Sequence, residues 1–268
     1  MPPPPGGPSS CECCLTGEGD RPQRRRSRFS YLDFVLVQRD YVRGYSQALG
    51  RDMEHLHFGH GGRAILAFPT SMGRFYQWED FGMVEALAGW LETGQLQLWC
   101  IDSVDGESWY GKDRHPRERV ERHLQYERYI LDEVLPAMPG PPVTAGTSFG
   151  ALHALLVALR HPTRIRGFIA LSGAFDTARF LDGYSDDDTY FTNVMAFLPG
   201  LSDDSYLDPI RNQKPKVIAT GEEDPNVSDS VKVARLLRQK GVDVTLDLWP
   251  GWSHDWPYWK EMMRRYVQ

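Results

Sequence analysis

The sequence has only four cysteines, and their positions exclude a disulfide-stabilised fold. Cys11, Cys13 and Cys14 fall in one short stretch, and Cys100 stands alone in an apolar run. A structural zinc site needs a second group of ligands at suitable spacing, and none follows. The three histidines within 55–60 lack carboxylates at ligand spacing, so we interpret them as a solvated strand edge. We therefore expect no metal and a reducing compartment, the cytoplasm.

Long apolar runs and an excess of positive charge are also absent. No apolar run approaches the roughly 20 residues of a membrane span, and the first residues lack the apolar segment of a secretory signal. Lys and Arg total 30 against 36 Asp and Glu, which gives a net charge of −6 at pH 7. Because a net acidic chain is poorly suited to nucleic acid or anionic membranes, we expect neither partner. The oligomeric state stays open.

The chain contains a head rich in proline, glycine and arginine, followed by a long patterned region. Residues 1–28 are dominated by proline, glycine and charge, which predicts a disordered tail. Residues 29–268 are long enough for one sizeable core, and we predict a single domain there. A polar stretch at 174–213 is predicted to be a small cap-like insertion. Its aspartates in "GYSDDDTY" are interpreted as the start of a helix and not as a calcium site.

Short apolar runs alternate with helical periods along this domain. The runs predict strands at 64–69, 95–101, 142–146, 167–172, 214–221 and 242–250. Helices are predicted at 79–91, 116–136, 149–162, 229–241 and 255–266. This alternation implies a mostly parallel sheet with helices on both faces, and any site along the carboxyl edge of the strands. Two earlier strands, at 34–38 and 48–58, are predicted to form an antiparallel edge.

Ser148 lies in Gly146-Thr147-Ser148-Phe149-Gly150, which fits the pattern G-x-S-x-G between a predicted strand and a predicted helix. In this context the motif forms a sharp turn that exposes a nucleophilic serine. Side chains at 146 and 150 would clash where the strand and the helix approach each other, which explains both glycines. The alternative is a glycine-bounded turn with an N-cap serine, but the strand–helix context favours the nucleophile.

A nucleophilic serine needs a general base and an orienting carboxylate, which follow this motif in the order acid, then histidine. His254 lies after the last predicted strand, and we predict that it is the base. The segment "GEEDPN" follows a buried strand and offers several carboxylates. We predict Asp224 as the acid because it lies furthest into the loop, where Pro225 limits its backbone. Glu223 is the competing choice.

Two backbone N–H groups are expected to stabilise a reaction oxyanion. One is predicted from Phe149, directly after the nucleophile, and the other from the loop "PTSMGRF". Pro69 has no N–H group, so Ser71 or Met72 is the candidate there. The alternative interpretation of this loop is an ordinary strand-to-helix turn.

Aromatic side chains near these segments are candidates for the wall of a substrate pocket. They are Trp109, Tyr110 and Trp252. The alternative interpretation is ordinary core or surface packing.

Several segments together resemble the α/β-hydrolase serine esterases, in the group of esterase D, feruloyl-esterase-like enzymes and mycolyltransferases. They include "YSQALGRDMEHLHFGHGG", "FPTSMGRFYQWEDFGM", "GTSFG" and "HDWPYWKEMM", and span about 45–263. The compact bacterial esterases that end in "HDWPYW" look nearest. The resemblance implies the α/β-hydrolase fold and a triad of Ser148, Asp224 and His254. The acid loop departs from the pattern because it does not single out one carboxylate.

The resemblance implies cleavage of a small-molecule carboxylic ester through an acyl-enzyme intermediate, without a cofactor. Two alternatives remain. An acyltransferase of the mycolyltransferase type would accept an alcohol in place of water, and the missing export signal argues against it. A non-catalytic binding scaffold is the other, and the presence of serine, histidine and acid argues against it.

Overall fold

The structure is a computed structural model that describes residues 37–268. The predicted tail and its three cysteines lie outside the described residues, as do residues 34–36 of the strand predicted at 34–38. The strand prediction was wrong for the remainder of that segment, because the strand begins at Arg39.

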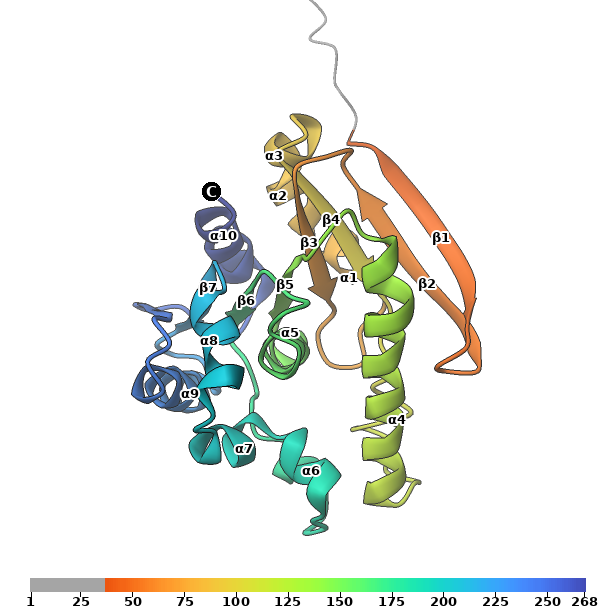
Figure 1. Ribbon diagram of the computed structural model, residues 1–268. Coiled ribbons are helices and arrows are strands. Elements are labelled where there is room, and N and C mark those ends of the chain that lie inside the picture. Colours follow the sequence, from red (N-terminus) through yellow and green to blue (C-terminus); the bar gives the residue numbers. More distant parts are fainter. Residues whose placement is uncertain (1–36) are drawn as a thin grey trace, which may run out of the picture. The chain divides into compact units, whose positions relative to one another are not determined.

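Eight strands form one sheet in the described part of the chain, in the order β1-β2-β4-β3-β5-β6-β7-β8. Strands β3 to β8 run parallel to one another, and β2 is antiparallel to both β1 and β4. Figure 1 shows the β1–β2 pair in orange at one edge of the sheet. The strands are β1 (Arg39–Ser46), β2 (Arg51–Phe58), β3 (Arg63–Phe68), β4 (Leu96–Ile101), β5 (Val143–Thr147), β6 (Gly167–Leu171), β7 (Lys216–Gly221) and β8 (Thr245–Trp249).

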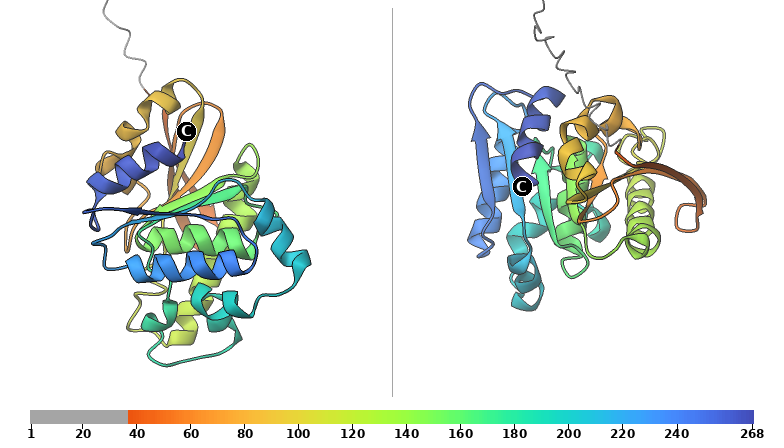
Figure 2. Two further views of the ribbon diagram at one scale, coloured as in Figure 1. Left: turned by 90° about the vertical axis from the view of Figure 1, so that its left-hand side faces the viewer. Right: turned by 90° about the horizontal axis from the view of Figure 1, so that it is seen from above.

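Helices cover both faces of the sheet, as Figure 2 shows. They are α1 (Gln77–Asp80), α2 (Met83–Ala86), α3 (Ala88–Glu92), α4 (Pro116–Tyr129), α5 (Phe149–Arg160), α6 (Asp187–Phe191), α7 (Val194–Gly200), α8 (Asp204–Asn212), α9 (Val227–Gln239) and α10 (Trp256–Tyr266). Helices α4, α5 and α9 contribute to the core on one face, and α1, α2, α3 and α10 to the core on the other. Because both faces are covered, every residue of β5 and β6 is buried.

Helix α5 lies at the centre of one layer, and its sequence explains that position. All of its residues except the last are buried, including Leu152, Leu155, Leu156 and Leu159. A helix that is apolar on nearly every side is stable only when neighbours surround it. The first residue of α5 directly follows Ser148, so the best-packed helix of this layer holds the predicted nucleophile.

Two helix predictions need correction. The segment predicted as one helix at 79–91 forms the three short helices α1, α2 and α3. Gly82 has a φ of 74°, a left-handed conformation that ends the first of them. The helix predicted at 116–136 is α-helical only to Tyr129 and continues as a π-helix (Ile130–Val134) and a 3₁₀ turn (Leu135–Ala137).

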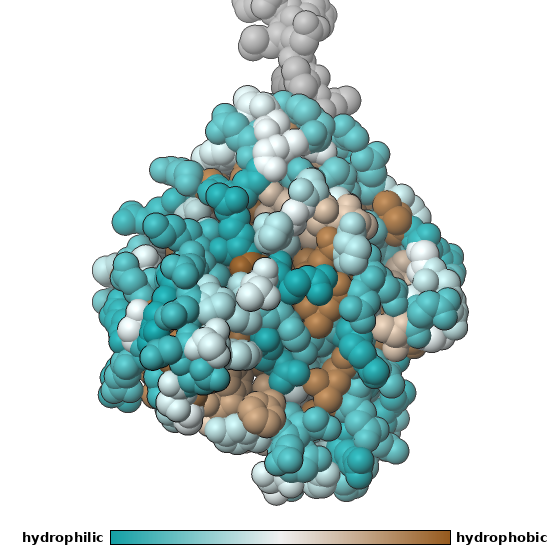
Figure 3. Space-filling model, viewed as in Figure 1, coloured by the Kyte–Doolittle hydropathy of each residue, from teal (hydrophilic) through white to brown (hydrophobic). Residues whose placement is uncertain are grey.

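The predicted insertion at 174–213 consists of a short 3₁₀ turn (Thr177–Phe180) and helices α6, α7 and α8. The prediction of a helix start among its aspartates is confirmed, since Asp186 caps α6 by accepting the N–H of Thr189 at 2.8 Å. Apolar side chains of the 3₁₀ turn, α7 and α8 join the core on the α5 face. Figure 3 shows that the surface on this side of the molecule is mainly hydrophilic, with small apolar areas.

Candidate active site

The turn between β5 and α5 places Ser148 in a strained backbone conformation. Its φ is 56° and its ψ is −121°, which non-glycine residues rarely adopt. Its N–H donates to the carbonyl of Leu171 at 2.8 Å, which fixes the turn against β6. A Cβ atom at Gly146 would lie 2.1 Å from the carbonyl oxygen of Gly150, and one at Gly150 would lie 2.4 Å from that of Pro69. The predicted steric need for both glycines is confirmed.

A continuous line of hydrogen bonds joins Ser148 to His254 and Asp224. The Oγ atom of Ser148 lies 2.9 Å from Nε2 of His254. On the other side of the imidazole, Nδ1 lies 2.9 Å from Oδ2 of Asp224. The three residues come from the ends of β5 and β7 and from the loop after β8, all in the parallel half of the sheet that runs β5-β6-β7-β8. The parallel order of these strands brings segments more than 100 residues apart into contact.

Asp224 is held in its charged form despite being buried. Its side chain is fully buried, and burial alone would favour the neutral acid. The hydrogen bond from His254, the nearby hydroxyl of Ser172 and the backbone N–H of Asn226 together outweigh burial and lower the pKa of Asp224. The N–H of Asn226 lies 2.8 Å from Oδ1. A charged carboxylate at Nδ1 favours the tautomer whose Nε2 can accept a proton.

The structure separates the carboxylates of the acid loop. Glu222 and Glu223 are exposed, whereas Asp224 points inward to His254. The N–H of Glu223 donates to the carbonyl of Trp252 at 3.0 Å, so the acid loop and the histidine loop are joined through their backbones. A Cβ at Gly221 would lie 1.9 Å from the same carbonyl, which shows how closely the two loops approach.

The three backbone N–H groups predicted as oxyanion donors differ in whether they already have a hydrogen-bond acceptor. Within residues 37–268, the N–H groups of Phe149 and Ser71 have no hydrogen-bond acceptor. Met72, the other candidate of that loop, needs correction. Its N–H donates to Oδ2 of Asp105 at 3.1 Å and is therefore engaged. Of the two candidates in the loop after β3, Ser71 is the one with a free donor.

Side chains around the loop after β3 hold it in place. Gln77 both accepts from the N–H of Thr70 at 2.7 Å and donates to its hydroxyl at 2.8 Å. Tyr110 donates from its hydroxyl to Oγ of Ser71 at 2.8 Å, and its ring packs edge-on against Phe149 at 5.4 Å. Tyr110 therefore contacts both residues whose N–H groups are free.

The other two aromatic candidates differ in burial. Trp109 is fully buried in the core, where it packs against His123 and Phe180, so its prediction as a pocket wall was wrong. Its large ring fills the space between α4 and the insertion. Trp252 is partly buried, and its ring packs against Trp249 and Tyr258 at centroid distances of 4.3 and 5.1 Å.

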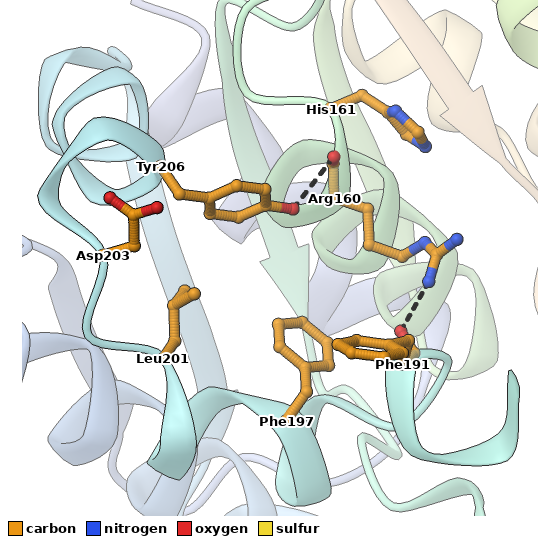
Figure 4. A pocket seen from close by; sticks show the side chains of 7 residues that line it. All are labelled: Arg160, His161, Phe191, Phe197, Leu201, Asp203 and Tyr206. Carbon is orange, nitrogen blue, oxygen red and sulfur yellow. Dashed lines mark hydrogen bonds between the residues drawn. The ribbon is translucent and has the colours of Figure 1, made fainter. Parts of the chain in front are cut away.

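A separate cavity of about 370 Å³ lies at the far end of α5 (Figure 4). It is lined by Arg160, His161, Phe191, Phe197, Leu201, Asp203 and Tyr206. Figure 4 shows the Tyr206 hydroxyl donating to the carbonyl of Arg160, a hydrogen bond of 3.0 Å. Because α5 begins beside Ser148 and ends at this cavity, the cavity lies far from Ser148, His254 and Asp224.

Within residues 37–268, no group of three His, Cys, Asp or Glu side chains is arranged to hold a metal ion. No helix in this range has the length and apolar character to cross a bilayer.

The comparisons with known proteins agree with this fold. The sequence model of the Prolyl oligopeptidase family matches residues 140–267, which include all three members of the hydrogen-bonded line. No curated protein matches the chain. A ferulic acid esterase superposes with a TM-score of 0.69 at 14% identity, covering 86% of this chain and 96% of that one.

Two S-formylglutathione hydrolases also match in structure. The enzyme from Agrobacterium tumefaciens has a TM-score of 0.66 at 15% identity over 86% of this chain and 93% of its own. That from Staphylococcus aureus has a TM-score of 0.63 at 16% identity, with 86% and 96% covered. At these identities the likeness shows the fold, and the predicted α/β-hydrolase fold is confirmed.

Proposed function

We propose that this chain is a serine hydrolase that cleaves small carboxylic esters, with Ser148, His254 and Asp224 as its triad. The observation that carries the proposal is the unbroken line of 2.9 Å contacts from Ser148 Oγ through the imidazole to Asp224. The strained turn at Ser148 supports it, because such strain is typical of residues held for chemistry.

In the proposed reaction, Nε2 of His254 takes the hydroxyl proton of Ser148 as Oγ attacks the ester carbonyl carbon. Asp224 stabilises the resulting imidazolium through Nδ1. When the tetrahedral intermediate collapses, the C–O bond to the alcohol breaks, and His254 returns the proton to the leaving oxygen. Water, deprotonated by His254, then attacks the acyl-enzyme and releases the acid and the free Ser148 hydroxyl.

The negative charge on the tetrahedral oxygen is proposed to be stabilised by the N–H groups of Phe149 and Ser71. Neither donor has an acceptor within residues 37–268, and the first belongs to the N-terminus of α5, where the helix dipole favours an anion. Donors that are fixed before the reaction need no reorganisation when charge develops. We keep Tyr110 as a candidate substrate contact, since it borders both donors.

The structural relatives suggest which esters to test first. One is a ferulic acid esterase and two are S-formylglutathione hydrolases, so aryl and alkyl carboxylic esters and thioesters form the first panel. The proposed steps use only side chains and backbone of this chain, and we propose that it acts without a cofactor on a small-molecule substrate in the cytoplasm.

A fluorophosphonate probe and p-nitrophenyl esters of graded acyl length test the proposal. We expect one probe adduct, mapped by mass spectrometry to Ser148, and measurable ester hydrolysis. Ser148→Ala should lose the adduct and lower kcat by roughly 10⁴-fold or more, with an unchanged circular dichroism spectrum.

Three outcomes would redirect or end the proposal. Hydrolysis that survives Ser148→Ala would rule out this nucleophile. A folded wild-type protein without adduct or turnover would favour a binding scaffold. If added alcohols divert most of the acyl group from water, the chain is an acyltransferase.

A further inference from the structure

Asp105 lies in a buried position beside the loop that follows β3. It is 1% exposed and follows β4 by four residues. One oxygen, Oδ2, accepts the N–H of Met72 at 3.1 Å. Met72 has a φ of 57°, which non-glycine residues adopt only when their surroundings require it. The contact therefore holds the residue next to Ser71 in an unfavourable conformation.

The second oxygen of Asp105 reaches the nucleophile helix. Oδ1 lies 3.1 Å from Nε2 of His153, whose side chain is 2% exposed. His153 lies on α5, about one helical turn after the Ser148 turn, and its ring packs edge-on against Phe149 at 5.1 Å. One carboxylate thus links the loop of Ser71 to the helix of Phe149.

The two atoms of this link differ in hydrogen-bonding role. A carboxylate oxygen accepts hydrogen bonds, which assigns the Nε2–H of His153 as the donor to Oδ1. Its Nδ1 has no partner among the described residues and is buried. A ring N–H at Nε2 rather than at Nδ1 fits this environment, because a buried N–H at Nδ1 would have no acceptor and would cost free energy. Asp105 then receives one donor on each oxygen.

We propose that Asp105 is a positioning residue for the oxyanion site. It fixes the distance between the N–H of Ser71, on the loop after β3, and the N–H of Phe149, at the start of α5. This inference rests on the proposed function and extends it to a residue that does not touch the substrate. Misplacing such a donor by about 1 Å is enough to cost on the order of 10²-fold in rate.

The test compares Asp105→Ala with Asp105→Asn in the full chain. In Asp105→Ala the Met72 N–H loses its acceptor, and we expect kcat for p-nitrophenyl esters to fall about 10²-fold with KM within about threefold. Affinity for a trifluoromethyl ketone, which forms a tetrahedral adduct, should fall by a similar factor. Asp105→Asn retains an oxygen for Met72 and can donate to His153 after a tautomer change, so it should keep at least a third of kcat.

A matched control separates positioning from general loss of stability. Gln213 is also buried and polar, and it donates to the carbonyl of Ala158 at 2.9 Å, at the opposite end of α5 from Ser148. Gln213→Ala should lower Tm, as Asp105→Ala does, but leave kcat unchanged. Should Asp105→Ala fail to fold, Asp105→Ser carries the same expectation, because its hydroxyl is too short to replace the carboxylate.

The outcomes separate this inference from the proposed function. If wild-type protein reacts with the fluorophosphonate at Ser148 but Asp105→Ala keeps its kcat, the positioning role is wrong. An equal loss of kcat in Gln213→Ala would also contradict the positioning role, because it would show that the effect of Asp105→Ala comes from a general loss of stability. If wild-type protein neither labels nor turns over, the proposed function itself fails.

Discussion

At the scale of single residues, Ser148 shows that the site stores backbone strain. The left-handed φ of 56° is disfavoured for any side chain with a Cβ atom and costs about 1–3 kcal/mol. The hydrogen bond from its N–H to Leu171 and the close approach of Gly146 and Gly150 hold it there. The protein accepts this cost at the position where the proposed nucleophile must be exposed.

Removing that Cβ should stabilise the protein. We expect Ser148→Gly to have a free energy of unfolding about 1 kcal/mol above that of Ser148→Ala, which keeps the Cβ and is the control. Urea unfolding followed by tryptophan fluorescence measures the difference. Both variants lack the hydroxyl, so activity does not enter the comparison. If the glycine variant is the less stable of the two, the turn is unstrained and the added chain entropy of glycine dominates.

The acid of the triad can be assigned by a pair of variants. Asp224→Asn places an amide against Nδ1 of His254 and favours the wrong tautomer, so kcat should fall by roughly 10³–10⁴-fold. Glu223→Gln changes an exposed side chain and should leave kcat within about twofold. Initial rates on one p-nitrophenyl ester suffice. The reverse ranking would move the acid to Glu223.

At the scale of elements, a buried carboxylate on α4 pairs with two basic side chains at the end of α5. Oε1 of Glu127 lies 3.0 Å from Nε of Arg160 and 2.9 Å from Nε2 of His161. Burial favours the neutral acid, but the hydrogen bond from His161 and the charge of Arg160 outweigh it and lower the pKa of Glu127 to about 2. Ion pairing therefore stabilises the contact between α4 and α5 in addition to apolar packing.

This carboxylate should make stability depend on pH. In the unfolded chain Glu127 titrates near 4.5. Below that pH the unfolded state binds more protons than the folded state, so the stability decreases as the pH is lowered. Between pH 7 and pH 3 this group alone should remove about 2 kcal/mol. Glu127→Gln should be less stable at pH 7, and its stability should fall correspondingly less on acidification.

Urea unfolding at several pH values measures this dependence. The control is Glu121→Gln, since Glu121 is half-exposed on the same helix and, within residues 37–268, pairs only with Arg117 across one turn. It should keep the wild-type dependence. An unchanged dependence in Glu127→Gln would show that other carboxylates account for the acid sensitivity.

At the scale of the whole molecule, the six strands predicted between 64 and 250, the central strand–turn–helix unit and the order of serine, acid and histidine were all readable from local patterns. Apolar runs and helical periods indicate which faces are buried, and the glycine pattern indicates a close backbone approach. Both signals lie in the local sequence and can therefore be detected without a structure. The same logic failed at 79–91, where the apolar period continues through Gly82 although the backbone turns there.

The sequence alone determined the six strands predicted between 64 and 250, the nucleophile candidate and the fold class, because these depend on neighbours along the chain. Only the tertiary structure decided which carboxylate faces His254, that the Met72 N–H is already engaged, that Trp109 is core, and that Asp105 joins the loop after β3 to α5. These facts depend on which side chains meet across the sheet. These contacts are determined by packing between segments that are distant in the sequence, and they produce no periodic sequence pattern.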